Sequence, residues 1–235
     1  MKGIISGVQS LGTVDGPGVR FVVFAAGCPL RCAYCHNPET WEKRGEEIEA
    51  EALAEKILRF KPYIKNGGVT LSGGEPLMQG EFFAALAAIL KRENLSVALD
   101  TSGNYFDEHT EKLVDLCDLF LLDVKFDSEE DYRRFTGGSL KKTLFFLDML
   151  KAKEKRVWIR QVVLEGINSG EEHAEKLKSI LAPFKGAIEK TELLPFRKLC
   201  MEKYHRMNIR FPFENLAETS EITLDRMNAV LSADR

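Results

Sequence analysis

Three cysteines, Cys28, Cys32 and Cys35, lie within eight residues of one another in the stretch Gly27–Pro38. A [4Fe–4S] cluster normally takes four thiolates, one for each iron. Three thiolates from one loop therefore leave one iron with an open coordination position. An open position lets a bound metal take up a substrate or cofactor instead of only holding a fold together. The C-x3-C-x2-C spacing thus predicts a cluster that takes part in chemistry.

The cysteines also allow other interpretations. A disulfide framework is disfavoured because the chain has five cysteines, an odd number, and no apolar signal segment at its start. A zinc site remains open, with His36 completing a Cys3His set, although zinc loops typically use two separated pairs of ligands. Cys117 lies in an apolar run and is predicted to be a core residue, and no role is assigned to Cys200.

The composition is ordinary for a soluble globular chain. The 235 residues are 44% apolar and 29% charged. A net charge of −3, from 33 basic and 36 acidic residues, gives no indication of a nucleic-acid partner. No apolar stretch approaches the roughly 20 residues that a membrane-spanning helix needs. We therefore expect a single domain over residues 1–235, in the cytoplasm, with no nucleic-acid or membrane partner.

Apolar segments rich in β-forming residues alternate with segments of helical periodicity. Strands are predicted over Arg20–Ala25, Val69–Leu71, Val97–Leu99, Leu119–Val124, Val157–Val163 and Ile188–Leu194. Helices are predicted over Glu51–Phe60, Glu81–Lys91, residues 109–116, Lys141–Lys151, residues 171–182 and Leu224–Leu231. This alternation is typical of an α/β fold with a mostly parallel sheet. A doubly wound sheet and an open, partial (β/α)6 barrel both fit it.

The turn Ser72-Gly-Gly-Glu75 follows the second predicted strand. In α/β folds, ligands bind at the ends of strands where such turns begin. Adjacent glycines, Gly73 and Gly74, allow a backbone to approach a ligand closely. A plain strand-to-helix turn is the simpler interpretation of the same residues.

Charged residues also occur at the ends of later strands. Asp123 and Lys125 are two positions apart, so they are expected on the same side of their strand. Arg160 lies inside an apolar strand, where a charge is costly unless it is paired or bound to a ligand. Asp100 and Asp123 could instead form ordinary turns. Together these residues favour a polar pocket inside the sheet.

The motifs together resemble one family. The cysteine motif, with the aromatic Tyr34 before its last cysteine, is similar to that of the radical S-adenosylmethionine (SAM) superfamily. Within that superfamily, the chain resembles the glycyl-radical-enzyme activating family. The matching segments, between residues 12 and 196, are GTVDGPGVRF, GCPLRCAYCHNP, GGVTLSGGEPL, LDTSG, LLDVK, VWIRQVV and ELLPF. The resemblance implies an α/β fold that is an open partial (β/α)6 barrel of the radical SAM type.

The resemblance also implies a reaction. A [4Fe–4S] cluster on Cys28, Cys32 and Cys35 would reduce SAM, and the resulting 5′-deoxyadenosyl radical would remove a hydrogen atom from a backbone glycine of a partner enzyme. The cofactors carry this chemistry, and the protein positions them. The residues expected at the cofactors are Tyr34, Cys35, His36, Gly73, Gly74, Glu75, Asp100, Asp123, Val124, Lys125, Arg160 and Arg197.

The family motifs imply roles for these residues. Residues 73–75 would bind the methionyl end of SAM, with the carboxylate of Glu75 on the SAM ammonium group. Residues 123–125 would line the region of the ribose and the SAM carboxylate. Tyr34 and His36 would approach the adenine, with Arg197 opposite.

Two further sets of residues are implied by the family. Asp100, Thr101 and Asp123 can hold a monovalent cation beside SAM. Asp15 and Arg20 lie in the turn-rich segment Gly12–Arg20, which leads into the first predicted strand. They are candidates for contacting the glycine loop of the partner enzyme.

The chain differs from the family in two ways. The family often has a histidine where this chain has Arg197, and an arginine cannot serve as an acid or base there. No cysteine lies between Asn37 and Cys117, so only one cluster is expected, and flavodoxin or ferredoxin would supply the electron. A single cluster favours pyruvate formate-lyase as the partner of a monomeric activase. Another glycyl radical enzyme, or a small molecule as in a deazapurine-forming cyclase, is the alternative substrate.

Overall fold

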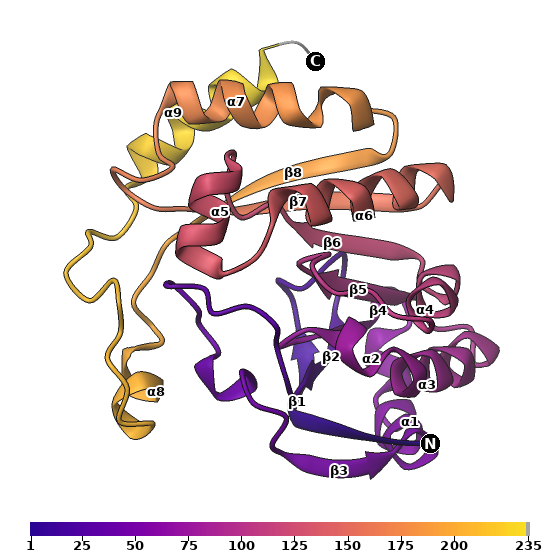
Figure 1. Ribbon diagram of the computed structural model, residues 1–235. Coiled ribbons are helices and arrows are strands. Elements are labelled where there is room, and N and C mark those ends of the chain that lie inside the picture. Colours follow the sequence, from indigo (N-terminus) through magenta and orange to yellow (C-terminus); the bar gives the residue numbers. More distant parts are fainter. Residues whose placement is uncertain (234–235) are drawn as a thin grey trace.

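The computed structural model describes residues 1–233 of the chain. One sheet, with the strand order β3-β1-β2-β4-β5-β6-β7-β8, forms its centre. The strands are β1 (Lys2–Gly12), β2 (Arg20–Ala25), β3 (Glu46–Glu49), β4 (Gly68–Gly73), β5 (Val97–Thr101), β6 (Leu119–Asp123), β7 (Arg156–Val163) and β8 (Ile188–Pro195). Because β3 and β8 lie at opposite ends of this order, the curved sheet is an open, partial barrel (Figure 1).

The six predicted strands are confirmed as the parallel part of the sheet, β2 and β4 to β8. The strands β1 and β3, which pair antiparallel at one edge, were not predicted. Glycines at positions 3, 7 and 12 interrupt the alternation of β1, and its pairing with β2 has two register shifts. An edge strand with such irregularities has no clean period of two for a sequence pattern to detect.

The helices lie mainly outside the curve of the sheet. They are α1 (Ala50–Leu58), α2 (Lys61–Ile64), α3 (Gly80–Arg92), α4 (Thr110–Leu116), α5 (Glu129–Thr136), α6 (Leu140–Ala152), α7 (Glu171–Leu181), α8 (Met201–Arg206) and α9 (Glu221–Ser232), with 3-10 turns η1 (Pro38–Thr40), η2 (Pro76–Gln79) and η3 (Ala182–Phe184). The six predicted helices are confirmed as α1, α3, α4, α6, α7 and α9. Helix α8 lies apart from the outer helices, beside the purple segment before β3 (Figure 1).

Helix α5 was not predicted, although its boundaries have clear local causes. The Ser128 side chain accepts a hydrogen bond from the Asp131 N–H and caps the first turn. Gly137 ends the helix in the left-handed region, at φ 72°. Its second half, Arg133–Thr136, packs beside the cysteine loop through backbone hydrogen bonds described below. This short helix therefore helps to position the site.

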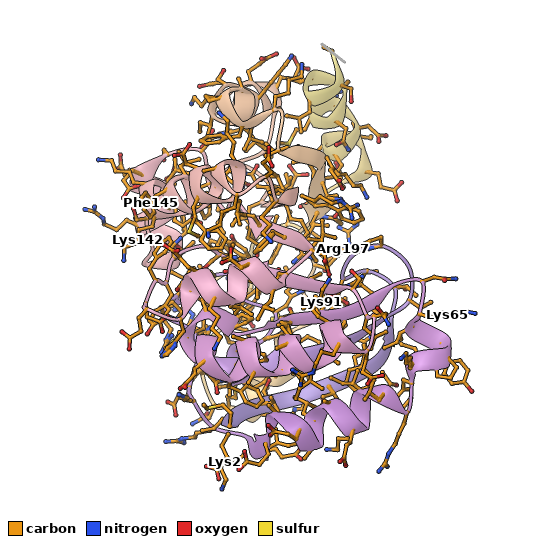
Figure 2. All side chains as sticks on the ribbon, turned by 90° about the vertical axis from the view of Figure 1, so that its right-hand side faces the viewer. Lys2, Lys65, Lys91, Lys142, Phe145 and Arg197 are labelled. Carbon is orange, nitrogen blue, oxygen red and sulfur yellow. The ribbon has the colours of Figure 1, made fainter. Side chains whose placement is uncertain are left out.

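The core lies between the sheet and the outer helices, and the central strands are buried on both faces. In β5, Val97, Ala98 and Leu99 are all fully buried, as expected for a covered parallel strand. In β7, burial alternates, so Arg160 lies on the face opposite Ile159. Figure 2 shows Phe145 projecting from the outer side of the molecule, consistent with its 65% exposure. Among residues 1–233, no helix is long and apolar enough to cross a membrane.

Candidate functional site

A cavity of about 230 Å³ lies at the carboxyl ends of the parallel strands. All three cysteines of the motif line it, together with strand-end residues from β4, β5, β6 and β7. Its lining residues are Cys28, Leu30, Cys32, Tyr34, Cys35, His36, Asn37, Thr40, Ser72, Gly73, Gly74, Asp100, Thr101, Ser102, Asp123, Lys125, Arg160, Val162 and Leu194. The structure therefore brings together the cysteine loop, the two glycines and the charged residues that the sequence motifs singled out.

The cysteines lie on an irregular segment, residues 26–41, which we call the cluster loop. Backbone hydrogen bonds hold its first half: the Arg31 N–H donates to the Thr136 carbonyl and the Ala33 N–H to the Phe135 carbonyl, both at 2.8 Å. Burial raises the pKa of Cys28 to about 12 and that of Cys32 to about 11. Without metal these thiols stay protonated at neutral pH, and bound iron would have to displace the protons.

The three thiols fit a cluster. Among residues 1–233, no three Cys, His, Asp or Glu side chains meet closely enough to hold one metal ion. A [4Fe–4S] cluster does not need such a meeting point, because each thiolate binds a different iron. Three thiols from one loop, facing one cavity, meet this requirement.

Four charged side chains form a connected group in the cavity. The Arg160 Nη2 lies 2.6 Å from Asp100 Oδ1, and its Nε lies 3.5 Å from Asp123 Oδ1. The Lys125 Nζ donates to Asp123 Oδ2 at 2.9 Å. The Ser72 hydroxyl donates to Asp100 Oδ2 at 2.7 Å. The prediction that Asp123 and Lys125 point to the same side is confirmed by this contact, although Lys125 lies two residues beyond the end of β6.

The environment shifts the pKa values of the two carboxyls in opposite directions. Burial raises the pKa of Asp100, although Arg160 opposes this. Burial also acts on Asp123, but Lys125 and Arg160 outweigh it and hold the pKa of that carboxyl below its usual value. Burial opposes the charge of Arg160, yet Asp100 and Asp123 raise its pKa. The group is thus a balanced set of two anions and two cations.

Two buried side-chain atoms in the described part of the chain lack a hydrogen-bond partner, the Tyr34 hydroxyl and the Arg160 Nε. Both residues line the cavity. Buried polar groups in folded proteins are nearly always hydrogen-bonded, so unpaired ones suggest a missing partner. The cavity therefore has the character of a site for a polar ligand.

Glu75 does not lie where the family motif implied. Its side chain is fully buried and is not part of the cavity lining. One carboxylate oxygen accepts from the Thr101 hydroxyl at 2.6 Å and the Leu77 N–H at 3.3 Å. The other accepts from the Ser102 N–H at 3.0 Å and hydroxyl at 2.6 Å. A carboxylate has about four acceptor positions, and all are used here, so the predicted contact with SAM is replaced by a link between the loops after β4 and β5.

The position of Arg20 also differs from the one expected from the sequence. Its side chain is fully buried at the start of β2, the end of that strand opposite the cluster loop. It donates to the Thr70 hydroxyl at 2.6 Å, to the Val69 carbonyl at 2.7 Å and to the Gly67 carbonyl. These bonds use its donors within the fold, so the predicted partner contact is wrong for Arg20.

Two further residues that were expected at the site, Asp15 and Val124, lie outside the cavity lining. Asp15 is partly buried, and its backbone carbonyl accepts from the Thr70 hydroxyl at 2.7 Å. Burial and the nearby Asp100 raise its pKa. Val124 is fully buried and contributes backbone hydrogen bonds, with its N–H donating to the Arg160 carbonyl at 2.9 Å. Neither Asp15 nor Val124 lines the cavity, and a partner contact of Asp15 stays a prediction.

Arg197 does not face the cavity. Its side chain donates to the Thr219 carbonyl at 2.6 Å, within the segment that follows β8 (Figure 2 labels this residue). Its own carbonyl accepts a hydrogen bond from His36 Nε2 at 2.7 Å. The predicted position opposite the adenine is therefore wrong for the Arg197 side chain. Its backbone instead orients His36, which does line the cavity.

Several cavity residues were not predicted. Ser72 and Ser102 lie beside the glycines and Asp100 in motifs that the sequence did highlight, so adjacency was an available signal. Leu30, Val162 and Leu194 supply apolar walls. Their apolar character is indistinguishable in sequence from that of core residues.

Comparison with known proteins identifies the family. Residues 14–144 match the model of the 4Fe-4S single cluster domain. The chain is 41% identical over 222 residues to the pyruvate formate-lyase-activating enzyme of Clostridium pasteurianum, covering 92% of this chain and 91% of that protein. It is 38% identical over 226 residues to the enzyme of the same name from Staphylococcus aureus, covering 92% and 90%.

Solved structures support the fold. A radical SAM methyltransferase from Sphaerobacter thermophilus has a TM-score of 0.65 at 15% identity, over 91% of this chain and 64% of that one. A domain of a pyruvate-formate lyase-activating enzyme from Bacteroides vulgatus has a TM-score of 0.59 at 22% identity, over 71% and 94%. The radical SAM fold predicted from the motifs is confirmed. The chain belongs to the family of pyruvate formate-lyase-activating enzymes.

Proposed function

We propose that this protein generates a glycyl radical on pyruvate formate-lyase. The observation that carries the proposal is the cavity in which three thiols, two glycines and a balanced group of four charges meet. When bound, a reduced [4Fe–4S] cluster supplies one electron for the cleavage of SAM, whose 5′-deoxyadenosyl radical then removes a hydrogen atom from a glycine. The protein has to bind SAM in one orientation, exclude water and admit the partner's loop.

The charged group suits the charges of SAM. SAM carries an ammonium, a sulfonium and a carboxylate, so a site for it needs both acidic and basic groups. Asp100 and Asp123 are the acidic groups of the lining, and they take the role that the motif gave to Glu75. Lys125 and Arg160 provide donors for the carboxylate of SAM. Asp100, Asp123 and Thr101 could alternatively hold the monovalent cation that the family implies.

The other roles follow from position. Cys28, Cys32 and Cys35, which all line the cavity, would hold the irons. Gly73 and Gly74 line the cavity, where their backbone would approach the methionyl end of SAM. A side chain at Gly73 would also meet the Ala25 nitrogen at 2.4 Å, so the packing against β2 itself requires a glycine there. Tyr34, with its unpartnered hydroxyl, and His36 lie on the adenine side of the proposed SAM orientation.

The proposal includes a cellular setting. A glycyl radical enzyme must insert a loop into the barrel, and the sheet remains open between β8 and β3. With one cluster, an external carrier such as flavodoxin or ferredoxin supplies the electron. We place the protein in the cytoplasm, as a monomer with one radical SAM domain over residues 1–235.

The test uses anaerobic, reconstituted protein with a short peptide containing Arg-Val-Ser-Gly-Tyr, deuterated at the glycine Cα. We expect deuterium in the 5′-deoxyadenosine that forms under reducing conditions. Formation of 5′-deoxyadenosine without deuterium would favour a small-molecule substrate. Metal analysis of the anaerobically purified protein, before reconstitution, tests the zinc interpretation, since one zinc and no iron would exclude the activase.

A further inference from the structure

The chain between β8 and α9 forms a closed loop, residues 196–219, which we call the C-terminal loop. Its two ends are tied together: the Phe196 N–H donates to the Thr219 hydroxyl at 3.0 Å, and the Thr219 N–H donates to the Phe196 carbonyl at 3.2 Å. Its interior is packed by its own aromatic rings, with Tyr204 and Phe211 4.7 Å apart. The C-terminal loop is therefore a structured unit, with helix α8 inside it.

The far end of the C-terminal loop, helix α8, contacts the cluster loop. The Lys203 Nζ donates to Asn37 Oδ1 and to Glu39 Oε1, both at 2.6 Å. The Tyr204 hydroxyl donates to the backbone carbonyl of Cys35 at 3.1 Å. These contacts join residues about 165 positions apart in the sequence, and Figure 1 shows α8 beside the purple cluster-loop segment.

The two halves of the cluster loop are held by different parts of the protein. Arg31 and Ala33, on either side of Cys32, are bonded to the end of α5. The residues from Cys35 onward are bonded to the C-terminal loop, and the Tyr204 ring also contacts Trp41 at 6.0 Å. The Cys35 N–H also donates to the Cys32 carbonyl at 3.1 Å, so the contacts with α8 are a second restraint on Cys35, acting on its carbonyl and on the residues after it.

The contacts are poorly suited to a purely stabilising role. The side chains of Lys203 and Glu39 are 31% and 43% exposed, and such ion pairs contribute only about 0–1 kcal/mol to stability. They do fix the geometry of the segment that follows Cys35. Groups that orient metal ligands affect metal retention strongly even when they add little to folding.

We infer that Lys203 and Tyr204 are positioning residues for the third cluster ligand, so that the C-terminal loop controls retention of the iron–sulfur cluster. The inference rests on the proposed assignment of Cys35 as a ligand. The positioning role of Lys203 and Tyr204 is independent of SAM and of the partner enzyme.

The test measures release of iron to a chelator from anaerobically reconstituted protein, and the EPR spectrum of the reduced cluster. We expect Lys203→Met to release iron roughly 10-fold faster than wild type, because the loop after Cys35 loses its anchor. Tyr204→Phe should release it a few-fold faster and broaden the EPR signal. Lys203→Arg should restore the wild-type rate, since a guanidinium can bridge the same two oxygens.

Lys198→Met is the matched control. Lys198 lies on the same loop and its side chain donates to the Glu214 carbonyl at 2.7 Å, within that loop, so iron release from the variant should match wild type. Thermal unfolding of the metal-free proteins should be the same in all variants. A wild-type rate in the Lys203→Met/Tyr204→Phe double variant, or faster release matched by an equal loss of metal-free stability, would overturn the inference. Cys35→Ala tests the underlying assignment separately, since retention of full iron there would refute the ligand set itself.

Discussion

Two arginines are buried in the same sheet, and their surroundings differ. Arg20, at the amino end of β2, is fully buried and donates to one hydroxyl and several backbone carbonyls, and it forms no ion pair with a carboxylate of residues 1–233. Arg160, near the carboxyl end of β7, lies against Asp100 and Asp123, and its Nε makes no hydrogen bond although Asp123 Oδ1 is 3.5 Å away. Burial lowers the pKa of Arg20 to about 10, whereas the carboxylates raise that of Arg160.

The comparison separates the two ends of the sheet. At the amino ends, a buried charge is satisfied by the fold itself and holds the turn before β2 against β4. At the carboxyl ends, the charged side chains form ion pairs in a cavity, and the Arg160 Nε still lacks a hydrogen bond. Burial of a charge alone therefore does not indicate a functional site in this molecule, whereas unfilled hydrogen-bonding capacity beside a cavity does.

The largest expected effect concerns cysteines at the two ends of the sheet. Substituting Cys28, Cys32 or Cys35 by Ala should abolish the cluster, because three thiolates are the minimum for this ligand set. Cys117→Ala, on the buried turn before β6, should retain the iron content of wild type. Iron and sulfide analysis after anaerobic reconstitution checks both. Loss of iron in Cys117→Ala would contradict the assignment of all cluster ligands to the carboxyl end of the sheet.

Asp100→Asn should weaken SAM binding about 100-fold. Truncating one partner of a buried charge pair costs about 3 kcal/mol of binding free energy, which corresponds to a change of this size. Burial raises the pKa of Asp100. The variant removes one of the two carboxylates that pair with the buried Arg160, so it should also unfold at a lower temperature. SAM titration by EPR and thermal unfolding measure the two effects, and normal SAM affinity would remove Asp100 from the site.

Arg20→Met should lower the stability of the protein without weakening SAM binding. It leaves the Val69 and Gly67 carbonyls and the Thr70 hydroxyl without their buried donor, at a cost of about 3 kcal/mol in the free energy of unfolding. SAM affinity of the folded variant should equal that of wild type. Denaturant unfolding and SAM titration provide the measurements. A stable variant with weakened SAM binding would contradict the structural role of Arg20.

The smallest effect is a coupling between Glu75 and Ser102. Ser102→Ala removes one donor to the carboxylate, and Glu75→Gln removes its charge, so each should lower the free energy of unfolding by about 1–3 kcal/mol. Because both changes break one contact, the double variant should lose less than the sum of the single losses. Additive losses in a double-mutant cycle would show that the carboxylate does not join the two loops.

The sequence by itself determined the local elements and the ligand loop. Apolar strands such as β6 are continuous because both faces are covered, and this run is readable without a structure. The spacing of the three cysteines is likewise a local property. The strand and helix pattern left a doubly wound sheet and a partial barrel open. The family motifs between residues 12 and 196 then gave the radical SAM fold, the cluster and the family correctly, because each motif is a short local pattern.

Only the tertiary structure decided which polar groups face the cavity. Glu75 points away because its partners Thr101 and Ser102 come from another strand end, 26 and 27 residues later. Arg197 turns to Thr219 because the C-terminal loop closes on itself. Lys203 reaches the cluster loop across the fold. Side chains at strand ends are oriented by hydrogen bonds to distant residues, and no local sequence pattern contains those partners.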